Sequence, residues 1–380
     1  MNTDLLSVID LHGSPRLRGR IHGESLRPQI HALIDLHRQF ISDFFGVDPD
    51  DYLGRFREHA NFGAAIRRWA PSLLDEVAGL AEGAGIDFDS MLQHQLIDEE
   101  WAFGFYHWRP VVERNKCSAF AVAAEPGHPA YAGQNMDVPR YIDGGQVLFR
   151  ITDPDSDRVS YVFSYAGLIG LCGMNNVPIG ITCNTLNQLR PARTGLPVAF
   201  IVRQVLSHGS LDEALAFVRS IDHASGQNFI ISGRDGAHCF ECSAGKVVEF
   251  RGDAGGRRLC HTNHALANDD VGDFEALMRS LPEGERLHFS NSKQRYASIN
   301  GRLGDPARPA DLAAVKAALS AHDDPDNPVS RTYNDTHGSY IGFTAGSLIY
   351  DYGVPPRLHL ASGPPCSTDY RTFDLPERDR

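Results

Sequence analysis

The chain has 380 residues, of which 42% are hydrophobic and 22% charged, a composition typical of a globular protein with one large domain or two to three average ones. Its net charge of −12 argues against a binder of nucleic acid or of anionic membranes, since either would need a basic patch. No apolar run is long enough to span a bilayer, and we expect no secretory signal. The seven cysteines lack the spacing of a disulfide framework, which predicts free thiols and a cytoplasmic location.

The first third of the chain is predicted to be helical. Apolar residues recur at helical spacing within residues 24–46, and the segment 71–85 begins with Pro71 and ends at a glycine. Residues 87–101 have the pattern of a further helix. No long flexible linker follows this region, so we expect it to pack on the rest of the chain.

After residue 117 the pattern changes to short β-rich runs separated by Gly, Pro and Asp turns. The predicted strands are 118–124, 146–151, 160–165, 179–184, 228–233, 237–243, 246–250, 340–350 and 356–361. The predicted helices are 196–209, 210–221, 289–301 and 309–321; the second has a capping box formed by Ser210 and Glu213. Strands in runs and helices in pairs predict an α+β fold with antiparallel sheets covered by helices.

Cys117 stands at the border between these two regions. If the chain were cut before it, Cys117 would carry both a thiol and a free α-amine. An α-amine has a pKa near 8, so it can act as a base at neutral pH. Nucleophile and base would then come from one residue. Considered alone, a cysteine at the start of a strand is more often an ordinary core or surface residue.

Several motifs in order resemble those of the penicillin acyltransferase-like family of cysteine N-terminal nucleophile hydrolases, the group of isopenicillin N acyltransferase. They are RLRGRIHGESL (16–26), DEVAGLAEGAGIDFDSMLQHQ (75–95), KCSAF (116–120), GQNMD (133–137), AGLIGLCGMNNVPIGITCNTL (166–186), CHTNH (260–264) and SRTY (330–333). The resemblance covers nearly the whole chain. It implies a four-layer αββα sandwich, with residues 1–116 as a helical leader or α subunit packed on a catalytic body or β subunit, 117–380.

The resemblance also implies the roles of the site residues. Cys117 would be the residue of autocatalytic cleavage, which makes the uncut chain a zymogen, and the catalytic nucleophile. Asp137 would orient the new α-amine, and Asn184 would donate its side-chain N–H to the oxyanion. Asn263 and Arg331 would surround the nucleophile, with the arginine favouring the thiolate. Considered alone, Asp137 is equally a turn-capping residue, Asn184 and Asn263 end strands, and Arg331 suits an ion pair with Asp335.

One residue departs from the family pattern. The fungal enzyme has glycine before its nucleophile, whereas this chain has Lys116. Cleavage between Lys116 and Cys117 by attack of the thiol on the preceding carbonyl is helped by a strained backbone, which glycine tolerates and lysine resists. The departure leaves open cleavage by an outside protease.

Two other motifs invite different interpretations. Cys239 and Cys242 form a CxxC, but they fall in a predicted strand, where residues three apart point to opposite faces. His261 and His264 near Cys260 suit a satisfied structural pair better than a metal site. The aromatic run WAFGFYHW (101–108) is either core or the wall of an apolar acyl pocket.

The sequence therefore predicts an amide-bond hydrolase or acyltransferase that forms a thioester on Cys117 and needs no cofactor or metal. Its partner would be a small-molecule N-acyl amide, and the cut fragments would stay together as a heterodimer; a homo-oligomer remains open. One alternative is an unprocessed, non-catalytic binding protein on the same fold. Another is a zinc or redox protein built on Cys239, Cys242 and Cys260.

Overall fold

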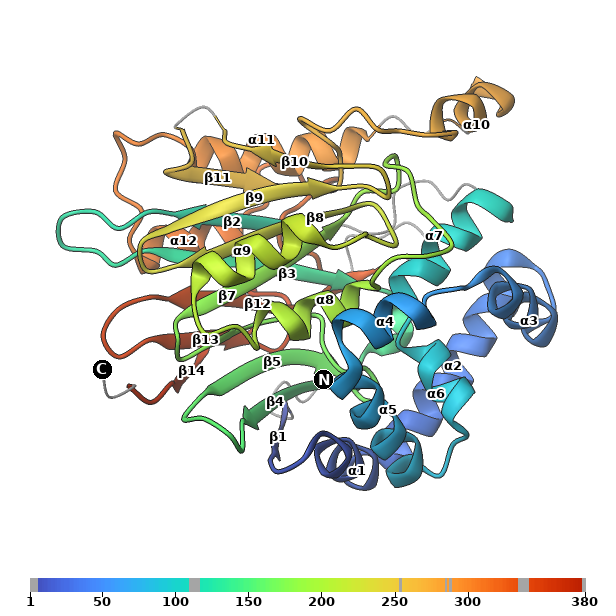
Figure 1. The fold of residues 1–380 in the computed structure, drawn as a ribbon. Helices are drawn as coiled ribbons and strands as arrows, with labels where there is room; N and C mark the ends of the chain where they lie inside the picture. The colour runs from blue at the N-terminus through green and yellow to red at the C-terminus, as the bar shows by residue number, and fades with distance from the viewer. Residues whose placement is uncertain are drawn as a thin grey trace.

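The computed structural model describes residues 6–108, 117–252, 255–283, 286, 289–333 and 342–377. Two β-sheets form its centre (Figure 1). The first sheet has the order β1 (Ser7–Leu11), β4 (Gln146–Thr152), β5 (Val159–Tyr165), β6 (Cys172–Asn175), β7 (Ile179–Thr185), β8 (Gln227–Gly233), β9 (Gly236–Cys242) and β10 (Val247–Phe250). The second has the order β11 (Arg258–His261), β2 (Ser118–Val122), β3 (Tyr131–Val138), β12 (Phe343–Asp351), β13 (Arg357–Ala361) and β14 (Arg371–Asp374).

Helices cover the outer face of each sheet. The helices α8 (Val198–Val205) and α9 (Leu211–Ser220) contact β7 and β8 of the first sheet. The helices α11 (Ser290–Leu303) and α12 (Leu312–Leu319) contact β11, β2 and β3 of the second. Contacts between β2 or β3 and β7 join the two sheets at their inner faces. This confirms the predicted α+β fold with four layers.

The leader supplies seven helices beside the sheets (Figure 1). They are α1 (Pro15–Ser25), α2 (Arg27–Phe45), α3 (Pro49–His59), α4 (Gly63–Trp69), α5 (Pro71–Ala84), α6 (Phe88–His94) and α7 (Ile97–His107). Two short elements, η1 (Arg140–Ile142) and α10 (Phe274–Ser280), complete the described helices. In the described part of the chain, none of the helices has both the length and the apolar character needed to cross a membrane.

Local sequence patterns predicted the positions of most of the described helices and strands. The predicted helix 24–46 corresponds to α2, and the predicted strands have counterparts in the two sheets. At the start of α9, Ser210 Oγ accepts the N–H of Glu213 at 3.2 Å, as the capping box predicts. The Glu213 carboxylate accepts the N–H of Gly209 at 2.9 Å, one residue earlier than the reciprocal bond of a standard box.

The prediction of one helix over 87–101 is wrong, because tertiary bonds break it at Gln95. The Gln95 amide donates to the carbonyls of Met91 and Gly167, at 2.9 and 2.8 Å, and accepts the N–H of Ile169 at 3.0 Å. These bonds fix the break to the 166–169 segment of the body. Residues 95 and 96 therefore separate α6 from α7.

The strand β1 was not predicted. It pairs in parallel with β4, the one parallel pair among the described strands, with Ser7 opposite Val147 and Leu11 opposite Ile151. The pairing joins segments about 140 residues apart, so no local pattern could show it. Through β1 the leader completes an edge of the first sheet.

Glycines explain the two leader motifs. The helices α1 and α5 pack so closely that a Cβ on Gly19 would lie 1.8 Å from the Glu76 carbonyl oxygen, and one on Gly79 would lie 2.0 Å from the Arg16 carbonyl oxygen. Gly23 and Gly83, one turn further along each helix, meet the facing backbone in the same way. Larger side chains at these positions would force the helices apart.

A buried ion pair links the leader to the body. Glu76 of α5 is 1% exposed and accepts two hydrogen bonds from Arg203 of α8, at 2.6 and 3.0 Å. Arg18 of α1 adds a third at 3.1 Å. Burial alone would raise the pKa of Glu76, but the two guanidinium groups reverse the effect and lower it.

Candidate active site

Cys117 lies directly before β2, on the second sheet, and is buried with 5% of its surface exposed. Its Sγ lies 3.7 Å from the carbonyl oxygen of Asp137 and 3.7 Å from Sδ of Met136. Burial and the charge of Asp137 raise the pKa of the thiol to about 12, against smaller opposing effects of the Asp137 carbonyl and Arg295. In the continuous chain the thiol is therefore protonated and poorly nucleophilic.

Asp137 lies on β3, which pairs with β2 in antiparallel orientation. Its Oδ1 accepts a hydrogen bond from Thr344 Oγ1 at 2.7 Å, and Thr344 is its neighbour on β12. The carboxylate is 3% exposed and sits within a strand. Asp137 therefore does not cap a turn, and its charge acts on the Cys117 thiol.

Asn184 lies on β7, on the face of the first sheet that meets the second. Gly180 lies four residues earlier on the same face, and a Cβ at this position would lie 2.6 Å from the ring of Tyr350 of β12. The Asn184 side-chain oxygen accepts the Asn228 amide at 2.8 Å, which fixes the orientation of the amide. Its Nδ2 is buried and has no hydrogen-bond partner among the described residues. This leaves a preoriented donor between the sheets.

Cys239 extends this chain of contacts. It lies on β9, and its thiol donates to Asn228 Oδ1 at 2.9 Å, which holds the residue that orients Asn184. Cys242, at the end of the same strand, approaches the Phe240 carbonyl instead. The two cysteines thus lie in a strand, as predicted, and do not share one set of contacts.

Arg295 is the site residue that sequence analysis missed. This α11 side chain is 1% exposed; its Nη1 donates to the Cys117 carbonyl at 2.6 Å and to Ser118 Oγ at 2.9 Å, and its Nη2 donates to Asn263 Oδ1 at 2.9 Å. The Asn263 amide in turn donates to the Thr185 carbonyl at 3.1 Å. A predicted amphipathic helix gives no signal that one arginine points inward, although a buried arginine is rare.

Arg331 is connected to the site through its backbone. Its N–H donates to Thr344 Oγ1 at 2.9 Å, and its carbonyl accepts the Thr344 N–H at 3.0 Å. Thr344 is the residue that holds Asp137. Lys116, the other half of the expected cleavage site, and Asp335 lie outside the described residues.

Two leader carboxylates, also missed from sequence, lie close to this network at the start of α7. Asp98 accepts hydrogen bonds from Thr185 Oγ1 and Gln227 Nε2, both at 3.2 Å, and its charge contributes to the raised pKa of Cys117. Burial raises the pKa of Asp98 to about 6. Burial and the charge of Asp98 raise the pKa of Glu99 to about 8. Carboxylates with pKa values raised in this way are candidates for functional groups.

The remaining sequence candidates have structural partners. His261 is fully buried and bonds to Glu241 Oε1 at 2.8 Å across the two sheets, while His264 bonds to Ser292 Oγ at 2.8 Å. Among the described residues, no group of three or more His, Cys, Asp or Glu side chains is placed to hold a metal. In the run 101–108, Phe105 packs on Phe274 in a core cluster, and Phe103 and Tyr106 line a cavity.

The family of the chain follows from comparison with known sequences. The family model of acyl-coenzyme A:6-aminopenicillanic acid acyl-transferase matches residues 124–341, more than half of the chain. The chain belongs to this family. The match begins seven residues after Cys117 and includes Asp137, Asn184, Asn263, Arg295 and Arg331. This is the family that the sequence motifs resemble.

Individual relatives are distant. Protein dcd1A of Dictyostelium discoideum is 23% identical over 246 residues, which are 58% of this chain and 54% of that protein, so the chain spans about half the length of this relative. Among solved structures, the N-acylethanolamine-hydrolyzing acid amidase ortholog of Caenorhabditis elegans is 16% identical, with a TM-score of 0.43 over 68% of this chain and 100% of that one. Penicillin V acylase of Agrobacterium tumefaciens is also 16% identical, with a TM-score of 0.42 over 68% and 86% of the two chains.

Proposed function

We propose that the protein is an N-terminal nucleophile enzyme that acts on a small-molecule N-acyl amide through a thioester on Cys117, after cleavage between Lys116 and Cys117. The observation that carries the proposal is the position of Cys117 at the head of β2, with its thiol 3.7 Å from the backbone carbonyl oxygen of Asp137. A residue at the head of this strand gains an α-amine on cleavage, and the charge of the Asp137 carboxylate acts on the same residue. The two fragments, 1–116 and 117–380, remain associated as a heterodimer in this proposal.

In the maturation step, Sγ of Cys117 attacks the carbonyl carbon of Lys116. The C–N bond to Cys117 breaks, the thiol proton passes to the nitrogen, and a thioester joins Lys116 to Sγ. Water then hydrolyses the thioester, which releases the carboxylate of Lys116 and restores the thiol beside a free α-amine. Arg295 supports this step because its bond to the Cys117 carbonyl fixes the residue while the preceding bond changes.

In each catalytic cycle the α-amine takes the thiol proton, and the thiolate attacks the substrate amide carbon. The Asn184 Nδ2 donor is suited to the developing oxyanion, because it is buried, preoriented by Asn228 and not used by another described residue. The α-ammonium, held by Asp137, then protonates the leaving amine as the C–N bond breaks. Water or a second amine resolves the acyl thioester, which gives hydrolysis or acyl transfer.

The experiment that tests the proposal combines intact-mass spectrometry with an amide turnover assay. The purified protein should give two fragments that end at Lys116 and begin at Cys117, and only the cleaved form should release amine from N-acyl amides. An uncleaved protein that turns over amides would contradict the proposal. An uncleaved, inactive protein that binds ligands would support the alternative of a binding protein on this fold.

A further inference from the structure

A cavity of about 520 Å³ lies between the leader and the body. The leader lines it with Phe62 and with Ala102 and Phe103 of α7, all buried, and the body lines it with the 190–193 segment and Ala224. We call it the leader cavity. Its volume is in the range of small-molecule sites, and its buried wall is aromatic and aliphatic.

Glu99 is the polar group of this wall. The side chain is 4% exposed, and its Oε1 accepts the N–H of Val198 at 3.2 Å and the hydroxyl of Ser225 at 2.9 Å. Its Oε2 is buried and has no hydrogen-bond partner in the described part of the chain. A buried polar atom without a partner costs free energy, so the unused position calls for a ligand atom.

We propose that the leader cavity binds a neutral, apolar group of the substrate, and that Glu99 donates a hydrogen bond from Oε2 to an oxygen atom of that group. The inference deepens the proposed function and rests on it in one respect, namely that the bound group is part of the amide processed at Cys117. Binding itself does not depend on Cys117. An ether, ketone or ester oxygen on an aryl or alkyl group has the required chemistry.

Charge explains why the group must be neutral. Burial and the charge of Asp98 raise the pKa of Glu99 to about 8, which favours its protonated, hydrogen-bond-donating form at neutral pH. An anion placed beside it would face the ionised Asp98 and an apolar wall. The titratable groups around the cavity are Asp98, His59, Tyr106, His107, Arg190, Arg193 and Asp273. Of these, Arg190, Arg193, His107 and Asp273 are exposed at the mouth.

Asp98 connects the cavity to the catalytic residues. It is adjacent to Glu99 on α7, accepts a hydrogen bond from Thr185 beside Asn184, and influences the Cys117 thiol. The residue next to Glu99 is thus hydrogen-bonded to β7, the strand that carries Asn184. The leader would then contribute to specificity after cleavage.

Two isosteric probes test the hydrogen bond. The ligands 4-methoxybenzyl alcohol and 4-ethylbenzyl alcohol differ by one ether oxygen in place of a CH₂ group. Ligand-observed NMR titration of the full chain at pH 7 should show about fivefold tighter binding of the ether, as expected for one added hydrogen bond. The preference should fall above pH 8, where Glu99 ionises and repels the ether oxygen.

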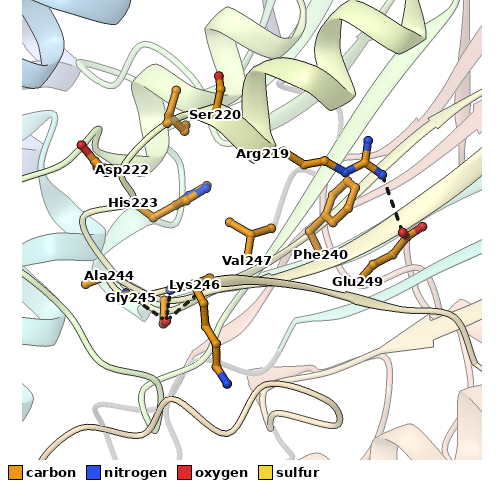
Figure 2. Close-up of a pocket in the computed structure, with 12 residues that line it drawn as sticks. Arg219, Ser220, Asp222, His223, Phe240, Ala244, Gly245, Lys246, Val247 and Glu249 are labelled. Atoms are coloured by element: carbon orange, nitrogen blue, oxygen red, sulfur yellow. Dashed lines mark hydrogen bonds and ion pairs between the residues drawn. The ribbon is translucent and has the colours of Figure 1, made fainter.

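Two substitutions locate the effect. Glu99→Gln keeps an acceptor for Val198 and Ser225 and offers an amide donor to the cavity, so the ether preference should persist and lose its dependence on pH. Ala102→Trp fills the cavity and should weaken both probes at least about tenfold. The control is Val247→Trp in a separate cavity of about 430 Å³ beside the β9–β10 turn (Figure 2), where binding should be unchanged.

Equal affinities of the two probes, or normal binding in Ala102→Trp, would overturn the inference. The same titration of Cys117→Ala separates it from the proposed function. Probe binding and its ether preference should be retained in Cys117→Ala, even if no amide is ever turned over by the wild-type enzyme. Conversely, amide turnover with no ether preference would reject the cavity and keep the chemistry.

Discussion

Two glutamates of the leader, Glu76 and Glu99, are buried against the body in opposite ways. Glu76 meets Arg203 and Arg18 with three hydrogen bonds, and its pKa is lowered. Glu99 meets one N–H and one hydroxyl, keeps an unpartnered oxygen, and has a pKa raised to about 8. Both side chains are less than 5% exposed, so burial alone does not distinguish them.

The two carboxyls differ in how far hydrogen bonds and opposite charges compensate for their burial. A buried charge that is fully paired holds two parts of a protein together but has no capacity left for chemistry. A buried carboxyl with an unused oxygen costs stability and keeps a proton near neutral pH, which suits binding or catalysis. We therefore propose that the contacts around Glu76 hold the leader on the body. We propose that Glu99 and Asp98, next to the network of Cys117, belong to the functional site.

Cys117→Ala is expected to have the largest effect, on both cleavage and amide turnover. It should leave an uncut chain whose amide turnover falls by more than about a thousandfold, because the thiol is needed for cleavage and catalysis. Intact mass and turnover are the measurements. Cys117→Ser should cleave slowly and turn over poorly. A Cys117→Ala chain that is cut but inactive would assign cleavage to an outside protease and keep the nucleophile.

Asp137→Asn should lower turnover by about a hundredfold or more, since it removes the charge that holds the α-amine while Thr344 can still bond to the side-chain oxygen. The measurement is kcat on the cleaved protein. The matched control is Asp351→Asn, an aspartate that accepts the N–H of Gly353 in a turn at the other end of the sheet. Equal activities of the two variants would return Asp137 to a structural role.

Asn184→Ala should reduce kcat by about 100- to 1,000-fold with little change in KM, because its donor is expected to act in the transition state. Steady-state kinetics on the cleaved protein measure this. Asn228→Ala removes the bond that orients Asn184, together with the bond from Cys239, but keeps the Asn184 donor, so it should have a smaller effect on kcat. A change confined to KM would place Asn184 in substrate binding instead.

Glu76→Leu tests the buried ion pair between the leader and the body. It leaves Arg203 and Arg18 without their carboxylate, and should destabilise the protein by about 3–5 kcal/mol. Denaturant unfolding measures this. The control is Glu82, which lies on α5 like Glu76 and forms an exposed ion pair with Arg16 of α1. Glu82→Ala should leave stability unchanged. Wild-type stability in Glu76→Leu would show that this ion pair does not stabilise the contact between the leader and the body.

The last expected effect is the pH dependence of stability at Glu99. Its pKa is raised from 4.5 to about 8 on folding, so the folded state binds more protons and wild-type stability declines as pH rises between these values. Glu99→Gln should therefore gain stability relative to wild type from pH 5 to pH 9. Thermal unfolding at several pH values measures the difference. A difference that is constant with pH would reject the raised pKa.

Most of the fold could be predicted from the sequence, because strands and helices of this length carry their own periodicity and caps. The capping box at Ser210 and the strand position of Cys239 are examples, and both depend on neighbours within a few residues. The strand β1 and the break at Gln95 could not be predicted, since each depends on partners more than 70 residues away.

The sequence by itself determined the boundary at Cys117, the change from helices to sheets, and the residues that match the family motifs. Only the tertiary structure decided that Arg295 contacts the Cys117 carbonyl, that Asn228 and Cys239 orient Asn184, and that Asp98 and Glu99 are buried carboxyls with raised pKa values. The physical reason is that a residue's type sets which hydrogen bonds and charges it can offer. Burial and distant partners set which of them are used.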